Sequence, residues 1–545
     1  MPMISSIVNL PDNVQDLKEI IAEREQQYQT YIKLLEEKIR LLQDKIFGRR
    51  SEKFNDSKYQ QLALFNEAED TIDKEPEDDD SDTVIVPAHS RKKRGRKPLP
   101  DHLPRVTVEH DLPEEDKVCG CGAKMDCIGD EVSEKLDIIP AKVQVIRHIR
   151  YKYACKKCEG LESDDGAVKI APCPAQIIPK GIASEGLAAH IVVSKFADHL
   201  PFYRQEGIMA RLGVEIPRAT MANWTMHIGS ECEPLLNLME QEIIRGPVVN
   251  IDETPLQVLG EPGRPNTSKS YMWVFRGGPI DRPVLIFQYH PTRSGEVARK
   301  FLEKYHGYVQ TDGYKVYEDL DKQAGIIHVG CWSHARRNFT DVIKAMHGGK
   351  KAAKKKEGVT TTALSYIGQL YEIERQAKEK CLQPDEIYQL RQEKSKPILE
   401  KLKKWFEEKY PATPPKGLLG KAIYYCLNRW KSLERYLEDG RLKIDNNLIE
   451  NAIRPFALGR KNWLFSGNPR GAKASAALYS LIETAKANGL DPYWYLRFLF
   501  GRLPLARTEQ DYRALLPHLV DREELRQFTA IINAQFSNAP SFQIA

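Results

Sequence analysis

The first regular pattern of apolar and polar positions lies between residues 14 and 47. The segment lacks Gly and Pro, and from Tyr28 onward its apolar positions alternate steps of four and three, with Glu, Lys and Gln between them. This spacing predicts a helix that pairs with another helix, and the alternative is a single amphipathic helix packed on its own protein. The apolar positions are Ile21, Tyr28, Ile32, Leu35, Ile39, Leu42 and Ile46.

The next stretch changes from acidic to basic. Residues 67–82 read EAEDTIDKEPEDDDSD, which predicts a disordered linker because little in it can be buried. RKKRGRKPLP follows at residues 91–100, and its Arg-Gly-Arg-Lys-Pro core could lie along the minor groove of A·T-rich DNA. Arg94, Arg96 and Lys97 are the candidate DNA contacts, and a solvated basic linker is the alternative.

Two close cysteine pairs follow. Cys119 and Cys121 form one pair, and Cys155 and Cys158 form the other after a β-rich stretch. Disulfides are rare in the cytosol, so clustered cysteines there are better interpreted as metal ligands, and two pairs on tight turns predict a zinc ribbon. The first pair is tighter than usual, so Cys127 could replace one member; buried free thiols are the alternative.

Residues 183–228 have the pattern of successive helices. A break at Leu212-Gly213-Val214 is followed by a helix that Pro217 opens, which resembles helix-turn-helix. Arg218, Thr220 and Asn223 are the exposed positions expected to contact DNA. The same pattern also occurs in helical cores that bind nothing.

The most β-rich block begins at GPVVNIDETPLQV. A buried strand there delivers Asp252, and strands at 271–275 and 283–289 follow through short turns. A helix near 295–305 leads to YVQTDGY, a strand that presents Asp312, and then to a strand at 326–330 and another helix. This is the element order of a ribonuclease-H-like domain, in which neighbouring strands bring their aspartates together. Such carboxylates suit two Mg²⁺ ions about 3.5–4 Å apart, whereas a single Asp at a strand end is usually a turn or cap residue.

A third carboxylate is expected from a later helix. Glu450, 138 residues after Asp312, is the candidate, and the excess length predicts a helical insertion. Its alternative role is a capping box with Asn447 as N-cap. The pattern of the residues alone does not separate the two.

Composition adds little. The chain of 545 residues has a net charge of +5, 41% hydrophobic residues and 29% charged residues, values ordinary for a cytoplasmic protein of several folding units. No run approaches the roughly 20 apolar residues of a membrane span, and the N-terminus lacks a signal-peptide pattern.

Several long motifs resemble the insertion-sequence-sixty-six family of bacterial transposases, in family order from about residue 35 to about residue 500. They include FGRRSEKF, GRKPLP, VSEKLDIIP, KYACKKCE, KFADHLPFYRQEGIMARLGV, VVNIDETP, VQTDGY, CWSHARRNF, IDNNLIENAIRP, LGRKNWLFSG and YSLIETAKANGLDP. The resemblance implies a DDE triad of Asp252, Asp312 and Glu450 that binds Mg²⁺ or Mn²⁺. It also implies that Cys119, Cys121, Cys155 and Cys158 bind structural Zn²⁺.

Other positions follow from the same motifs. Cys331 and His334 match a C-x2-H pattern beside the active site of several transposase groups, with a packed Cys and a core His as the alternative. Arg454, Arg460 and Lys461 are expected to contact phosphates, against plain surface charge. Some DDE enzymes carry a Lys two turns after the Glu, where this chain has Ala457.

The predicted fold is multidomain α/β. Its segments are 1–55, a coiled-coil helix; 56–117, the acidic linker and AT-hook-like segment; 118–175, a zinc-ribbon-like domain; 176–240, the helix-turn-helix region; 245–348, the first part of the ribonuclease-H-like core; 349–440, the helical insertion; 441–485, the second part of the core with Glu450; and 486–545, a C-terminal helical element.

The resulting prediction is a DNA transposase that cleaves element ends and joins the 3′ ends to target DNA. A non-catalytic DNA-binding regulator and a metal-dependent nuclease are the alternatives. The expected partners are double-stranded DNA with terminal inverted repeats, target DNA, a second copy bound through the N-terminal helix, and small accessory proteins. The expected location is the bacterial cytoplasm, at the nucleoid when bound to DNA.

Overall fold

The computed structural model describes residues 13–47, 143–148, 152–154, 168–170, 174–317, 319–347 and 358–537. The chain divides into two compact units, residues 67–171 and the remainder. In the smaller unit, β1 (Lys152–Ala154) pairs antiparallel with β2 (Val168–Ile170). The four predicted zinc cysteines, Cys127, and the basic residues Arg94, Arg96 and Lys97 lie outside the described residues.

The predicted N-terminal helix is α1 (Val14–Phe47). Its apolar positions Tyr28, Ile32, Leu35, Ile39 and Leu42 are all exposed in the single chain. Whether a second helix covers them stays a prediction. No described helix is long and apolar enough to cross a membrane.

A five-stranded mixed sheet forms the centre of the larger unit, in the order β5-β4-β3-β6-β7. The first three strands are an antiparallel meander, and β6 and β7 run parallel to β3. This element order matches the prediction for the β-rich block. The elements are β3 (Val248–Gln257), β4 (Lys269–Gly277), β5 (Val284–His290), α6 (Gly295–Phe301), β6 (Gly307–Gln310), β7 (Ile326–Val329) and α7 (Trp332–His347).

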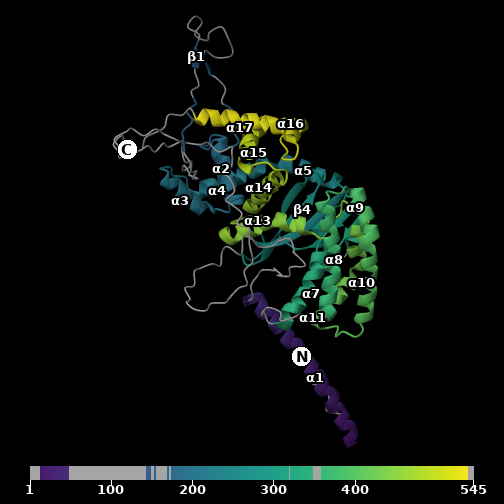
Figure 1. Cartoon of the computed structure of the whole chain (residues 1–545). Helices are drawn as coiled ribbons and strands as arrows, with labels where there is room; N and C mark the ends of the chain where they lie inside the picture. The colour runs from purple at the N-terminus through teal and green to yellow at the C-terminus, as the bar shows by residue number, and fades with distance from the viewer. Residues whose placement is uncertain are drawn as a thin grey trace, which may run out of the picture. The chain divides into compact units, whose positions relative to one another are not determined.

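Helices from both ends of the unit surround the sheet (Figure 1). Those before it are α2 (Glu185–Phe196), α3 (Phe202–Arg211), α4 (Arg218–Glu231) and α5 (Glu233–Arg245). Those after it are α13 (Asn447–Trp463), α14 (Pro469–Ala487), α15 (Pro492–Arg502), α16 (Glu509–Ala514) and α17 (Arg522–Ser537). Of these helices, α5, α13 and α14 pack on the strands of the sheet, and the others pack on these three or on one another. One hydrophobic core contains residues from Ile177 to Leu525, so α2, the end of α4, α5 and the C-terminal helices share a core with the sheet. A smaller cluster of Ile191, Met209, Ile216 and Met221 lies between α2, α3 and the start of α4.

The edge of the sheet is closed by α14. An open edge strand presents unpaired N–H groups, which invite pairing with other chains. Ser480 and Thr484, one helical turn apart, accept hydrogen bonds from the backbone N–H groups of Phe287 and Leu285, at 2.8 and 2.9 Å. These two side chains thereby supply acceptors for backbone N–H groups of β5, and they fix the position of α14 along the strand.

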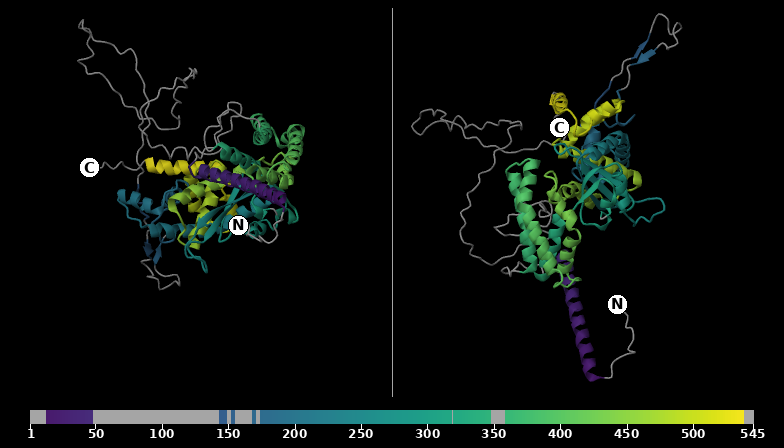
Figure 2. Two further views of the ribbon diagram at one scale, coloured as in Figure 1. Left: turned by 90° about the horizontal axis from the view of Figure 1, so that it is seen from below. Right: turned by 90° about the vertical axis from the view of Figure 1, so that its right-hand side faces the viewer.

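The predicted insertion is a helical bundle, shown by the green helices beside the sheet in Figures 1 and 2, and its core is shared with β7 and α7 through Val329, Trp332 and Phe339. It contains α8 (Val359–Glu379), α9 (Pro384–Leu390), a π-helical turn (Arg391–Ser395), α10 (Lys396–Lys409), α11 (Leu418–Asn428) and α12 (Trp430–Glu434). Arg391, only 1% exposed, pairs with Glu374 at 2.7 Å. Its guanidinium also donates to the carbonyl groups of Tyr436, Asp439 and Leu442, which joins the bundle to the chain that leads into α13.

Candidate active site

The register of two parallel strands brings the predicted aspartates together. β3 pairs with β6 so that Val248 lies opposite Tyr308 and Asn250 opposite Gln310. The same offset places Asp252 level with Asp312, just beyond the paired residues. Both side chains are half-buried. Strand order had predicted this approach, and the register now gives its geometry.

The electrostatics of Asp252 reflect this crowding. Burial raises the pKa of Asp252 well above its usual value, and the nearby carboxylates of Glu253, Asp312 and Glu450 raise it further. The backbone N–H of Glu253 donates to Asp252 Oδ1 at 2.8 Å, which opposes the rise. Asp312 Oδ1 accepts from the N–H of Tyr314 at 2.9 Å, which holds the loop after β6. Asp252 therefore lies close enough to Asp312 and Glu450 for their charges to act on it.

A buried amide network positions Glu450. Asn250 Nδ2 donates to Gln310 Oε1 at 3.1 Å and to Asn446 Oδ1 at 2.9 Å. Asn446 Nδ2 donates to the carbonyl of Ile251 at 3.1 Å. These bonds connect β3, β6 and the start of α13, so Glu450, in the first turn of that helix, faces the strands that carry the aspartates.

The alternative interpretation of Glu450 as a capping residue does not hold. The helix begins at Asn447, which makes Asn446 its N-cap rather than Asn447. The side chain of Asn446 is committed to β3, and the N–H of Asn447 is bonded by Asp445 Oδ1 at 3.2 Å. Asp445 therefore accepts the hydrogen bond from the first N–H of the helix, and the Glu450 carboxylate faces α7 and the aspartates instead.

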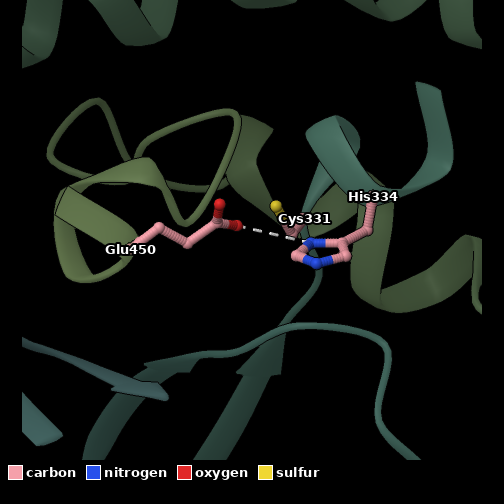
Figure 3. A group of neighbouring side chains, drawn as sticks. All are labelled: Cys331, His334 and Glu450. Atoms are coloured by element: carbon pink, nitrogen blue, oxygen red, sulfur yellow. Dashed lines mark ion pairs between the residues drawn. The ribbon is translucent and has the colours of Figure 1, made fainter. Parts of the chain in front are cut away.

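Cys331 and His334 come together with Glu450, as Figure 3 shows. His334 Nδ1 lies 3.7 Å from Glu450 Oε1, and one ligand atom from each of the three residues falls within 4.8 Å of the others. Burial and then the charge of Arg337 lower the pKa of His334 to about 4, so its ring is neutral at pH 7. Cys331 Sγ accepts the N–H of Asn446 at 3.1 Å, and burial raises its thiol pKa to about 12. At pH 7 the thiol thus anchors the start of α13.

Sequence reasoning missed two groups beside the carboxylates. Arg337 Nη2 lies 3.7 Å from Glu450 Oε2, and its position three residues after His334 on α7 could have suggested it. Glu253 is buried, paired with Arg293 and hydrogen-bonded by the hydroxyl group of Tyr317. The guanidinium carbon of Arg293 also lies 3.6 Å from the ring centroid of Tyr314, so this group braces the Asp312 loop against β3.

The other predicted DNA contacts lie on two separate elements. Arg218 and Asn223 are exposed on α4, with Thr220 half-buried, and the Gly213 break has the positive φ expected of a turn between helices. On α13, Lys461 is exposed and Arg454 half-buried. The Arg460 guanidinium instead donates to Thr254 and to the carbonyl of Pro255, so it joins α13 to β3. Ala457 lies on the same helix.

Carboxylates from two adjacent strands and one docked helix are typical of enzymes that use divalent metals on phosphodiesters. The comparison with protein families agrees. The family described as "Transposase IS66 family" matches residues 180–474, "zinc-finger binding domain of transposase IS66" matches 116–159, "Transposase C of IS166 homeodomain" matches 34–108, and "IS66 C-terminal element" matches 480–518. The chain belongs to the IS66 transposase family.

Two similar proteins come from Sinorhizobium fredii. The uncharacterized protein y4jD is 32% identical over 524 residues, which cover 93% of this chain and 96% of y4jD. The uncharacterized protein y4qI is 34% identical over 441 residues, 78% of each chain. The protein is therefore a transposase with a zinc-finger domain and DNA-binding regions, and the resemblance found in the sequence motifs is confirmed.

Proposed function

We propose that this transposase cuts DNA at the ends of its element and joins the freed 3′ ends to target DNA, with Asp252, Asp312 and Glu450 as the metal-binding catalytic residues. The observation that carries the proposal is that the β3–β6 register and the docking of α13 bring the carboxylates of β3, the end of β6 and the first turn of α13 close enough for Asp312 and Glu450 to raise the pKa of Asp252. We further propose that the mixed sheet is a ribonuclease-H-like fold, on the basis of its strand order.

The donor set fits Mg²⁺ or Mn²⁺. Burial is the main cause of the raised pKa of Asp252, and the neighbouring carboxylates raise it further. A cation would offset both effects, and hard cations prefer oxygen ligands. Two bound ions would polarise the phosphate, activate the attacking oxygen and stabilise the leaving 3′ oxygen. Structural Zn²⁺ would be held by Cys119, Cys121, Cys155 and Cys158 within the family's zinc-finger domain.

The residues around the carboxylates contribute position and charge. The amides of Asn250, Gln310 and Asn446 hold α13 on the strands, and this fixes the spacing between Glu450 and Asp252. Arg337, beside Glu450, can orient that carboxylate and contact a phosphate oxygen. Cys331 and His334 support the same corner: the thiol anchors Asn446, and the neutral ring lies against Glu450.

The other proposed DNA contacts are the basic and polar residues that the sequence motifs predict to bind DNA. Arg94, Arg96 and Lys97, the α4 residues Arg218, Thr220 and Asn223, and the α13 residues Arg454 and Lys461 would contact the inverted repeats or target DNA, whereas Arg460 holds α13 on β3. The exposed apolar face of α1 would pair two copies, so that two ends are held together. Small accessory proteins and a cytoplasmic, nucleoid-bound location complete the proposal.

The test replaces Asp252 by Asn in the full-length protein, with Asp281→Asn as matched control, because Asp281 is an exposed Asp on the turn between β4 and β5. With Mg²⁺ and end-bearing duplexes, we expect Asp252→Asn to lose cleavage by about a thousandfold or more while DNA binding and the control remain normal. Transfer of a labelled 3′ end to target DNA separates a transposase from a nuclease, and binding without cleavage identifies a regulator.

A second readout does not depend on accessory proteins. Mn²⁺ should raise the thermal midpoint of the wild-type protein and of Asp281→Asn, because a ligand that binds the native state stabilises it. Asp252→Asn should lose that shift. Equal shifts in all three proteins, or normal cleavage by Asp252→Asn, would contradict the assignment of Asp252.

A further inference from the structure

The turn that follows α13 presents two apolar side chains to solvent. Leu464 is 64% exposed and Phe465 is 44% exposed. Leu464 has φ +65° and ψ −52°, and the N–H of Phe465 donates to the carbonyl of Trp463 at 2.8 Å. This is the rare, strained form of the γ-turn, in a residue type that disfavours positive φ. Strain of this kind persists where the surrounding structure enforces it.

The surrounding structure does enforce this turn. The N–H of Ser466 donates to the carbonyl of Gln257 at 3.0 Å, and the carbonyl of Ser466 accepts from Leu259 at 2.9 Å. On the other side, Arg460 is bonded to Thr254 and Pro255. The turn is thus attached on both sides to β3 and the residues that follow it, the strand that carries Asp252. Leu464 and Phe465, which we name the LF pair, are exposed on a rigid support.

Two measures place the LF pair relative to the carboxylates. Glu450 and Trp463 are 13 residues apart on α13, which at a rise of about 1.5 Å per residue is about 20 Å. Asp252 and Gln257 are five residues apart on β3, which at about 3.3 Å per residue is about 17 Å. Both elements run from the site toward the turn. A DNA strand that ran along α13 would span about five or six nucleotides over this distance.

The chain around the LF pair is basic. Residues 451–482 contain five Arg or Lys residues and no Asp or Glu. Lys461, Arg470 and Lys473 are exposed. A rigid apolar pair among positive charges complements DNA, because the cations contact phosphates while an apolar side chain stacks on or inserts between bases.

We propose that the LF pair is a base-unstacking wedge: Phe465 stacks on a base of the DNA end about five or six nucleotides from the cleaved bond, and Leu464 fills the gap that the displaced base leaves. This proposal rests on the proposed function, since it places the DNA end along α13. It differs from the phosphate contacts of α13 because it concerns the bases and the path of the strand.

The experiment uses the full-length protein and duplexes that carry the element's own terminal repeat. A single 2-aminopurine replaces one base per duplex, and the series of duplexes covers the nucleotides about three to about nine from the cleaved bond. Its fluorescence rises when it is unstacked. We expect wild-type protein to raise it at one position, and Phe465→Ala to abolish that rise. Ile280→Ala, which shortens an exposed aliphatic side chain on the turn between β4 and β5, is the control and should leave the rise intact.

Cleavage gives the second readout. Phe465→Ala should cleave a fully paired end about tenfold more slowly, because stacking of one base is lost. A mismatch at the responsive position should restore most of that rate, since the base there is already unstacked. Leu464→Gly relieves the positive φ, so it should fold stably and still lose part of the fluorescence rise.

The fluorescence readout is independent of chemistry. It should persist in Asp252→Asn, so a failure of the proposed catalytic residues remains distinguishable from a failure of the wedge. Binding without a fluorescence rise at any position would overturn the wedge. A change in oligomeric state in Phe465→Ala, with the rise unaltered, would instead make the LF pair a protein contact and also overturn it.

Discussion

Replacing Asn446 by Ala tests whether the buried amides position the active site. Asn446 is 1% exposed, and its side chain joins the start of α13 to β3 through two hydrogen bonds, to Asn250 and to the carbonyl of Ile251. Truncation removes one hydrogen-bond acceptor from the buried amide of Asn250 and one donor from the buried carbonyl of Ile251. At about 1–3 kcal/mol for each such group, the free energy of unfolding should fall by about 2–4 kcal/mol, because some relaxation is expected.

Activity should fall further than stability suggests. Glu450 lies four residues after Asn446, and Asp252 directly follows Ile251, so the lost bonds join the two backbones that carry these carboxylates. A displacement of about 1 Å at reacting groups can cost roughly a hundredfold in rate. We expect Asn446→Ala to cleave about a hundredfold more slowly while it binds DNA normally.

Urea unfolding and cleavage of end-bearing DNA measure the two effects. Asn462→Ala is the matched control: Asn462 is exposed near the other end of α13, and its loss should cost less than about 0.5 kcal/mol. Asn446→Asp keeps the size of the side chain but cannot donate to Ile251, so it should be at least as damaging as Ala. A variant Asn446→Ala with the stability and cleavage rate of Asn462→Ala would refute this account of how α13 is positioned.

Three other predictions concern stability, each measured by urea unfolding. Arg391→Met should cost about 3–5 kcal/mol because Glu374 and the carbonyls of Tyr436, Asp439 and Leu442 lose their donor, and Glu374→Leu in the same chain should recover only the part due to the uncompensated carboxylate; a loss below about 1 kcal/mol would contradict a structural role. Thr484→Val should cost about 1–3 kcal/mol because Leu285 N–H loses its acceptor, and a neutral result would mean that the edge of β5 is satisfied otherwise. Burial lowers the pKa of His518 to about 4, so the unfolded chain binds the extra proton between pH 6.5 and pH 4, and stability falls as pH drops through that window. The His518 contribution from pH 7 to pH 5 is about 2 kcal/mol, and His518→Phe should remove that part of the pH dependence, whereas an unchanged dependence would assign it to other groups.

Local patterns predicted much of the fold. The strand and helix order from Val248 to His347 follows from apolar runs, short turns and the helix after Cys331, and the structure has the same order. The break at Gly213 and the start of α4 after Pro217 were equally readable, because they depend on backbone preferences of single residues. These features are local, so neighbouring residues carry the information.

Which segments share a hydrophobic core was harder to predict from the sequence. The predicted segments 176–240 and 486–545 were listed apart from the sheet, and the structure has α2, the end of α4 and α15 in one core with it. Apolar helix faces indicate that something covers them, but not which distant element does so. Contacts such as Ser480 with Phe287 depend on how α14 lies along the edge of β5.

The active site also combines features that local sequence predicts with features that depend on distant contacts. The sequence by itself predicted that Asp252 and Asp312 belong to two neighbouring strands, and the parallel pairing of β3 with β6 brings them level, although β3 continues for five residues beyond Asp252. Only the tertiary structure decided how Glu450 is placed: Asn446 bonds Asn250 and Ile251, nearly 200 residues earlier in the chain, and those bonds orient the helix. A Glu in a capping box and a Glu that faces the two aspartates share one local pattern, and only long-range contacts, which local spacing does not encode, separate them.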